Sequence, residues 1–231
     1  MNESLQTVYG GGSSIALAQR NRVLRNTYWL LALSLVPTVL GAWIGVSTGV
    51  IARMGPGMSA MLFLGGAFAF MFAIEKTKDS AAGVGTLLAF TFFMGLMLSR
   101  LLAVILGFKN GSTLIMTAFG GTAGVFFAIA SLATVIKRDL SGMSKFLYVG
   151  ALVLLVAGLL NIFVLQSGAM VMTISVIAIG LFTAFMLYDI KQVMDGGETN
   201  YITATLQIYL DLYNIFQSLL SILGFAAGDR D

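Results

Sequence analysis

The sequence predicts an all-α membrane protein built as a bundle of seven transmembrane helices. Of its 231 residues, 58% are hydrophobic and only 10% are charged, whereas a soluble domain is typically about 45–50% apolar and about 25% charged. This number of charged residues is too small to cover the surface of a soluble protein. The chain also divides into seven apolar segments, each close to the roughly 20 residues that a helix needs to cross a bilayer.

Residues 1–26 are predicted to form a polar segment on the cytosolic side. A Gly/Ser stretch at 10–14 is followed by Arg20, Arg22 and Arg25, and the first apolar run begins after them. That run is longer than the roughly 7–15 apolar residues of a signal peptide. We therefore interpret it as the first membrane span.

The membrane domain is predicted to occupy residues 27–225, followed by a short C-terminal tail at 226–231. The breaks between spans are short and rich in charged residues, Gly and Asn, so no separate soluble domain is expected. In the fourth span, Gly120 and Gly124 have the spacing of a helix-packing motif and are expected to allow close helix approach. The expected spans are 27–52, 57–74, 83–107, 112–135, 146–165, 168–190 and 203–225.

The basic residues favour a cytosolic N-terminus and a periplasmic C-terminus, because cytosolic loops carry an excess of Lys and Arg. The inner side would then carry Arg20, Arg22, Arg25, Lys76, Lys78, Lys137, Arg138, Lys145 and Lys191, and the outer side Arg53, Arg100, Lys109 and Arg230. Arg100, near the outer end of the third span, is expected to extend its side chain to the outer interface. The alternative role for Arg100 is a gate charge.

The composition excludes most common catalytic chemistry. The chain contains no Cys and no His, so it has no disulfide, thiolate nucleophile, imidazole metal ligand or Ser-His-Asp triad. The basic residues are dispersed between apolar runs, and nucleic-acid binding is therefore not expected. We expect neither enzymatic activity nor a bound cofactor.

Two acidic residues inside the last two spans require an explanation. Asp189 lies near the inner end of the sixth span and Asp211 lies within the seventh, where burying a charge costs about 2.5–3.5 kcal/mol even on insertion scales. The two spans are consecutive and antiparallel, so both residues belong to the cytosolic half, with depths that differ by about 7 Å. If they meet, the carboxyl groups should share a proton and titrate together. Otherwise Asp189 simply ends its helix at the interface and Asp211 has a structural role.

Other oxygen-bearing side chains lie near this predicted pair. Gln207 and Asn214 share the helix face of Asp211, at i−4 and i+3. Because Ca²⁺ prefers roughly six to eight oxygen ligands, the two carboxylates and these amides predict only weak, transient Ca²⁺ binding. Asn161 in the fifth span is expected to form a hydrogen bond between helices rather than to bind an ion.

Intramembrane aspartyl proteases also place one Asp in each of two consecutive spans. In that class the second Asp follows a Gly-x-Gly sequence, which lets the substrate backbone approach. Here Ile208, Tyr209 and Leu210 precede Asp211, and these bulky residues argue against a protease.

The chain resembles the transmembrane Bax inhibitor motif family, and within it the YccA-like bacterial branch. The paired motifs Tyr188-Asp189 and Tyr209-Leu210-Asp211 are the most specific part of the resemblance, which covers nearly the whole membrane region. The matching stretches are 90–99, 113–127, 158–163, 186–189 and 208–216.

The resemblance implies a seven-helix fold with the last helix surrounded by the others. It also implies, for some members, a pH-dependent Ca²⁺ leak in which Asp189 and Asp211 form the pH-sensing pair. Some members have an arginine near the inner end of the second span that binds this pair; here Lys76 and Lys78 are the candidates to replace it. The bacterial branch further implies an inner-membrane protein that restrains a membrane-bound AAA protease, with residues 1–26 as a partner-binding segment.

The leading hypothesis from the sequence is a pH-dependent cation leak, for Ca²⁺ if the resemblance holds, gated by the proton-sharing aspartates. Its partners would be the bilayer, Ca²⁺ and protons. The alternative is an interaction protein that modulates an AAA protease or a stress response without transport.

Overall fold

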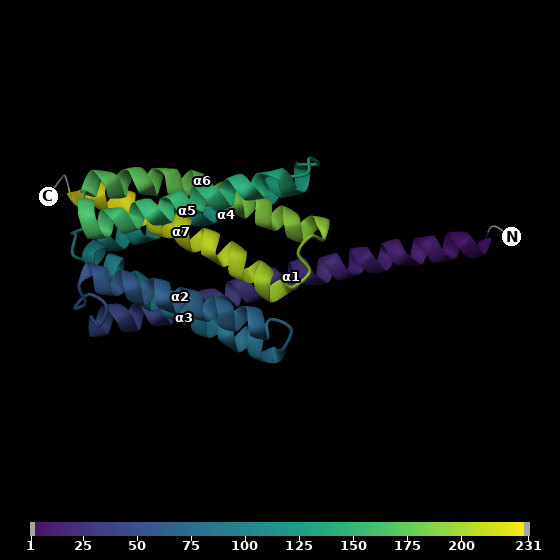
Figure 1. The fold of residues 1–231 in the computed structure, drawn as a ribbon, viewed down its shortest axis with the longest axis horizontal. Coiled ribbons are helices and arrows are strands. Elements are labelled where there is room, and N and C mark those ends of the chain that lie inside the picture. The colour runs from purple at the N-terminus through teal and green to yellow at the C-terminus, as the bar shows by residue number, and fades with distance from the viewer. Residues whose placement is uncertain (1–2, 229–231) are drawn as a thin grey trace.

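The computed structural model describes the chain from residue 3 to residue 228, and its side chains from residue 18 to residue 228. Seven long, apolar helices lie side by side in one bundle, as predicted (Figure 1). The end of the predicted tail at 229–231 lies outside the described residues. The helices are α1 (Glu3–Thr48), α2 (Pro56–Thr77), α3 (Ala81–Leu106), α4 (Gly111–Val135), α5 (Ser144–Leu160), α6 (Gly168–Asp195) and α7 (Tyr201–Gly228).

The first helix is much longer than predicted. It runs from Glu3 to Thr48, whereas the first predicted span begins only at residue 27, after Arg20, Arg22 and Arg25. The segment 15–25 consists largely of Ala, Leu, Gln and Arg, which are good helix formers, so the helix of the span continues outward. In Figure 1 this part of α1 projects alone beyond the bundle, at the opposite end from the C-terminus.

The last helix occupies the centre, as the resemblance implies. α7 contacts α1, α2, α3, α4 and α6, and Ile208, Ile215 and Leu220 on it are fully buried. It is also the least hydrophobic of the seven spans. A helix that is surrounded by protein rather than lipid can carry polar side chains, provided that neighbouring helices bind them.

The tyrosine hydroxyl groups of the central helix find hydrogen-bond partners on neighbouring helices. The hydroxyl groups of Tyr209 and Thr38 lie 2.8 Å apart, and Tyr213 donates a hydrogen bond of 3.3 Å to the carbonyl oxygen of Met94. These contacts connect α7 to α1 and α3.

Close packing of glycines occurs between α1 and α3, and the prediction for the fourth span was wrong. A Cβ atom on Gly41 would overlap the carbonyl oxygen of Phe92, and one on Gly95 would overlap that of Thr38. By contrast, a Cβ atom on Gly120 or Gly124 would meet nothing within 4 Å. Spacing alone did not identify the contact because it does not say which face of a helix meets a neighbour.

Asn161 and Arg100 both form hydrogen bonds, at the connections between helices, that the sequence did not predict. The Asn161 side-chain oxygen accepts a hydrogen bond of 2.9 Å from the Ser167 backbone N–H, so Asn161 closes the turn between α5 and α6 instead of joining two helices. Arg100 donates to the carbonyl oxygen of Met54 and to Ser59 Oγ, at 2.9 and 3.1 Å. It therefore fastens α3 to the connection between α1 and α2, which is an outer connection in the predicted topology.

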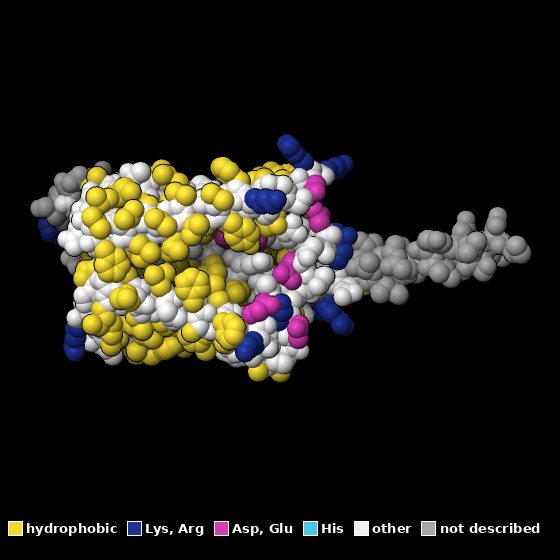
Figure 2. All heavy atoms as spheres, viewed as in Figure 1, with side chains coloured by type: hydrophobic (Ala, Val, Ile, Leu, Met, Phe, Trp, Pro, Cys, Tyr) yellow, Lys and Arg dark blue, Asp and Glu magenta, His cyan; other side chains and the backbone are white. Residues whose placement is uncertain are grey.

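Charged side chains collect at one end of the molecule. Figure 2 shows a broad hydrophobic belt, with most of the visible Lys, Arg, Asp and Glu side chains gathered at the end from which α1 projects. A belt of this kind is the surface expected for a protein embedded in a bilayer.

The glycine contact between α1 and α3 can be tested with Gly95→Ala. The added methyl group meets backbone atoms that cannot move aside, so we expect the variant to lose about 1–3 kcal/mol of stability and to melt earlier in detergent. Gly124→Ala is the matched control, because open space surrounds this glycine, and its melting temperature should not fall. Equal melting temperatures for the two variants would contradict this packing.

Candidate functional site

The structure brings Asp189 and Asp211 together. α6 and α7 pack against each other along their length, and the two carboxyl groups lie within hydrogen-bonding reach of one another. The side chains are buried, with 5% of Asp189 and 4% of Asp211 exposed. Neither residue therefore serves merely as an interfacial end of its helix. We call this contact the aspartate clasp.

Buried apolar side chains flank the aspartates of the clasp along both helices. Met186 and Ile190 on α6, and Ile208 and Ile215 on α7, are fully buried within one turn of the two aspartates. Such neighbours exclude water and make an isolated negative charge costly.

The clasp has no basic partner within the part of the chain whose side chains are described. None of the ion pairs found there includes either aspartate, and Asp211 Oδ2 is a buried oxygen without a hydrogen-bond donor. Two buried carboxyl groups in this situation require either a shared proton or a cation from solution. Proton sharing or weak cation binding is therefore the chemistry that this arrangement can support.

The predicted supporting side chains do not complete a cation site. Asn214 donates a 2.7 Å hydrogen bond to the Leu210 carbonyl oxygen of its own helix. Gln207 and Tyr188 are half-buried, and no hydrogen bond joins them to the clasp among the described residues. No group of three or more acidic side chains is found there either, so Asp189 and Asp211 would be the only carboxylate ligands of a bound Ca²⁺.

Lys76 and Lys78 do not reach the clasp, contrary to their proposed role as substitutes for an arginine. Lys78 Nζ lies 2.5 Å from the Glu75 carboxylate and donates a hydrogen bond to it, which raises the pKa of Lys78. The Lys76 ammonium group lies 4.5 Å from the centre of the Phe72 ring. Both lysines thus bind residues three or four positions earlier in the chain, as neighbours on a helix surface do.

Two titratable residues near the clasp were not predicted. Tyr148 of α5 lies close enough to interact electrostatically with both aspartates, and Glu198, between α6 and α7, with Asp189. Tyr148 belongs to a span with no polar pattern, and Glu198 lies in a loop. Only the tertiary structure shows that they approach the clasp.

A second group of contacts joins α1, α6 and α7 at the charged end. Val23, Val193 and Ala204 form a separate buried cluster, which we call the inner collar. Arg20 lies beside it and donates a hydrogen bond from Nη2 to the Met194 carbonyl oxygen. In the sequence, Arg20 served only to predict the orientation in the membrane. Its contact with the end of α6 could not be predicted, because local spacing does not show which distant helix end a residue meets.

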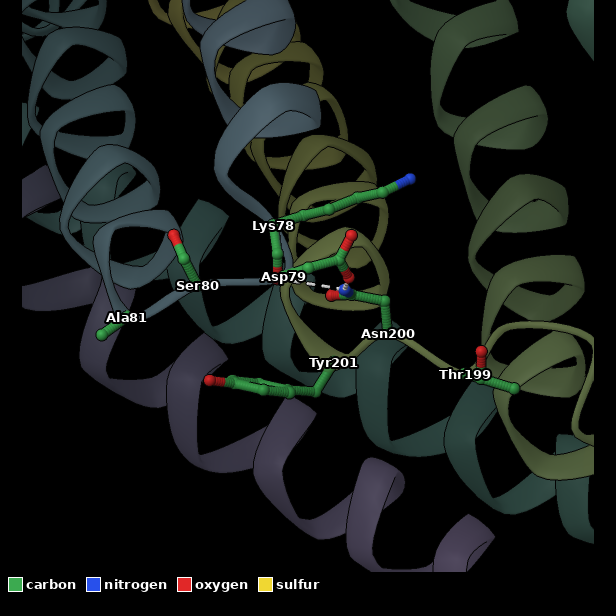
Figure 3. Close-up of a pocket in the computed structure, with 7 residues that line it drawn as sticks. All are labelled: Lys78, Asp79, Ser80, Ala81, Thr199, Asn200 and Tyr201. Carbon is green, nitrogen blue, oxygen red and sulfur yellow. Dashed lines mark hydrogen bonds between the residues drawn. The ribbon is translucent and has the colours of Figure 1, made fainter.

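The connections at this end are tied together by Asn200. Its side-chain oxygen accepts hydrogen bonds from the backbone N–H groups of Ile202 and Thr203, which caps α7. Its Nδ2 donates to the Lys78 carbonyl oxygen and to Asp79 Oδ1, each at 3.0 Å. Figure 3 shows the Asp79 contact. The residues around it line a hollow of about 530 Å³, and the clasp is not part of that lining.

The sequence matches the family described as "Inhibitor of apoptosis-promoting Bax1" over residues 20–228. It is 38% identical to the "Modulator of FtsH protease YccA" of Escherichia coli K12 over 214 residues, which cover 93% of this chain and 94% of that protein. An Escherichia coli O6:H1 protein named "Inner membrane protein YccA" matches with the same identity and coverage. An uncharacterized protein of Pseudomonas aeruginosa is 38% identical over 90% of each chain.

The family match, over residues 20–228, extends across all seven membrane helices. The chain is therefore an integral membrane protein of the Bax inhibitor-1 family, similar throughout its length to the YccA-like bacterial members.

Proposed function

We propose that this protein modulates a membrane-bound AAA protease in a bacterial inner membrane, with its N-terminus in the cytosol. The observation that supports this proposal most directly is the similarity over 93% of the chain to a protein named as a modulator of FtsH protease. The positive-inside rule supports the orientation, since the charged end in Figure 2 is also the end from which α1 projects.

The N-terminal part of α1 is the proposed contact with the protease. Helix α1 begins at Glu3, so residues 3–17 lie ahead of the arginines that precede the first apolar run. These residues correspond to about 22 Å of helix at 1.5 Å per residue. The other helices are joined by short connections. Within the described residues, α1 is therefore the element best placed to reach a partner outside the bilayer (Figure 1).

Deletion of residues 2–17 tests this role, because the shortened chain keeps Met1, the basic residues Arg20, Arg22 and Arg25, and the whole apolar run that follows them. We expect the variant to insert normally but to lose its effect on the protease, since it lacks the proposed contact. The measurement is the half-life of a membrane substrate of the protease, in cells that produce either form at equal levels.

A variant with residues 2–17 replaced by a Gly/Ser sequence of equal length separates loss of the contact from loss of length. The proposal predicts that this replacement behaves like the deletion. A substrate half-life that does not differ among the full-length protein, the deletion and the replacement would contradict the proposed contact.

A pH-dependent cation leak is the second candidate function, and the aspartate clasp is the observation that favours it. With a shared proton, Asp189 and Asp211 form a hydrogen bond that holds α6 against α7. Without it, two negative charges face each other in an apolar setting. The helices then separate, or the pair takes up a cation such as Ca²⁺. The unpartnered Asp211 Oδ2 gives such a cation a ligand.

The leak hypothesis predicts a Ca²⁺ flux that rises from about pH 5 to about pH 8, because loss of the shared proton with rising pH removes the bond that closes the clasp. In Asp189→Asn or Asp211→Asn, an amide can donate the hydrogen bond at any pH. We therefore expect a low flux that does not change with pH. The measurement is dye-reported Ca²⁺ entry into liposomes that contain the purified protein.

Glu75→Gln is the matched control for these variants, since it removes a carboxylate that is exposed at the surface. Its flux and pH profile should equal those of the parent protein. A flux no greater than that of empty liposomes at every pH would refute the leak and leave the clasp as a structural contact between α6 and α7.

A further inference from the structure

The beginning of the α1 span holds the inner end of α6. The Arg20 guanidinium donates a hydrogen bond to the Met194 carbonyl oxygen and lies 3.9 Å from the Asp195 carboxylate. The last carbonyl groups of a helix have no partner within the helix and carry partial negative charge, so an arginine is a favourable partner for them. The Arg20 side chain also passes Gly196, where an added Cβ atom would lie 3.4 Å from Arg20 Cδ. A glycine suits this position because its φ angle is +82°.

The same part of α1 also holds the beginning of α7. In the inner collar, Val23 packs against Val193 of α6 and Ala204 of α7, and Ala204 is fully buried. One turn further along α1, the carbonyl oxygen of Thr27 accepts a 3.3 Å hydrogen bond from Thr205 Oγ1. α1 therefore contacts both of the helices that form the aspartate clasp.

These contacts lie close to the clasp along each helix. Met194 follows Asp189 by five residues, or about 8 Å, and Ala204 precedes Asp211 by seven residues, or about 10 Å. α1 itself is a single helix from Glu3 through Arg20 and into the membrane. A displacement of its N-terminal part is thus carried by continuous helices to the two segments that bring the carboxyl groups together.

We infer that Arg20 is a positioning residue that couples the N-terminal part of α1 to the aspartate clasp. The inference rests on the proposed function, in which this part of α1 binds the protease. A protein bound there changes how closely α6 and α7 approach each other at the clasp. Because such coupling is reciprocal, closure of the clasp also changes how α1 binds its partner.

The absence of cysteine from the sequence allows a direct test. In the full-length protein in lipid nanodiscs, Ala204→Cys places a single thiol in the inner collar, and its reaction rate with a water-soluble maleimide measures how often the collar opens. Adding Arg20→Gln should raise this rate about tenfold, because the end of α6 is released. Arg22→Gln is the matched control, since it removes the same charge from an exposed position one turn away or less. It should change the rate by less than about twofold.

The coupling itself is measured with an antibody fragment bound to an epitope tag at the N-terminus. Binding of the fragment should change the thiol reaction rate in the protein that contains Arg20 and should leave the rate unchanged in Arg20→Gln. Arg20→Lys retains a cation near the Met194 carbonyl group and should therefore restore part of the response. If Arg20→Gln does not elute as a folded monodisperse protein in gel filtration, Arg20→Lys against Arg22→Lys provides the comparison.

Equal thiol reaction rates in Arg20→Gln and Arg22→Gln, or an antibody effect that is absent from the parent protein, would overturn the inference. These measurements involve neither the protease nor ion flux. A protein in which the coupling is found but substrate turnover is unaffected would therefore contradict the proposed function and not the coupling.

Discussion

The position of α7 inside the bundle is the constraint on which the other features depend. A helix exposed to lipid must be apolar, whereas a helix surrounded by protein can carry acidic, hydroxyl and amide groups if neighbouring helices provide partners. α7 contacts five other helices, and several of its polar side chains are buried between them. Tyr209 and Tyr213 bind groups on α1 and α3, and Asp211 meets Asp189 on α6. The hydroxyl contacts join the helix to α1 and α3, and the carboxyl contact joins it to α6.

The number and approximate limits of the helices could be predicted from the sequence because hydrophobicity along the chain decides which segments enter a bilayer. The meeting of Asp189 and Asp211 was foreseen as a possibility, since consecutive antiparallel spans place residues near their common loop at similar depths. These predictions needed only distances along the chain. They succeeded because the loops are too short to separate consecutive helices.

Features that depend on which helix faces meet were not predictable in the same way. Gly120 and Gly124 have the spacing of a packing motif but face open space, whereas Gly41 and Gly95 form the close contact between α1 and α3. Lys76 and Lys78 were candidates to bind the clasp but bind groups near them in sequence. Arg20 lies far in the chain from the end of α6 that it binds, and Tyr148 lies far in the chain from the clasp and near it in space. Rotation of each helix about its axis decides all these cases, and a single sequence with weak amphipathic periodicity does not specify it.

The close contact at Gly41 and Gly95 has a mechanical consequence for the bundle as a whole. Backbones that touch without intervening side chains cannot slide past each other without steric overlap, so α1 and α3 form one stiff unit, with α2 packed on α3. α4, α5 and α6 form a second group, and α7 crosses obliquely between the two (Figure 1). A tilt of α7 therefore cannot be absorbed locally. It must alter the angle between two blocks of helices. The free energy of that motion therefore depends on the packing contacts of both blocks and not only on those next to α7.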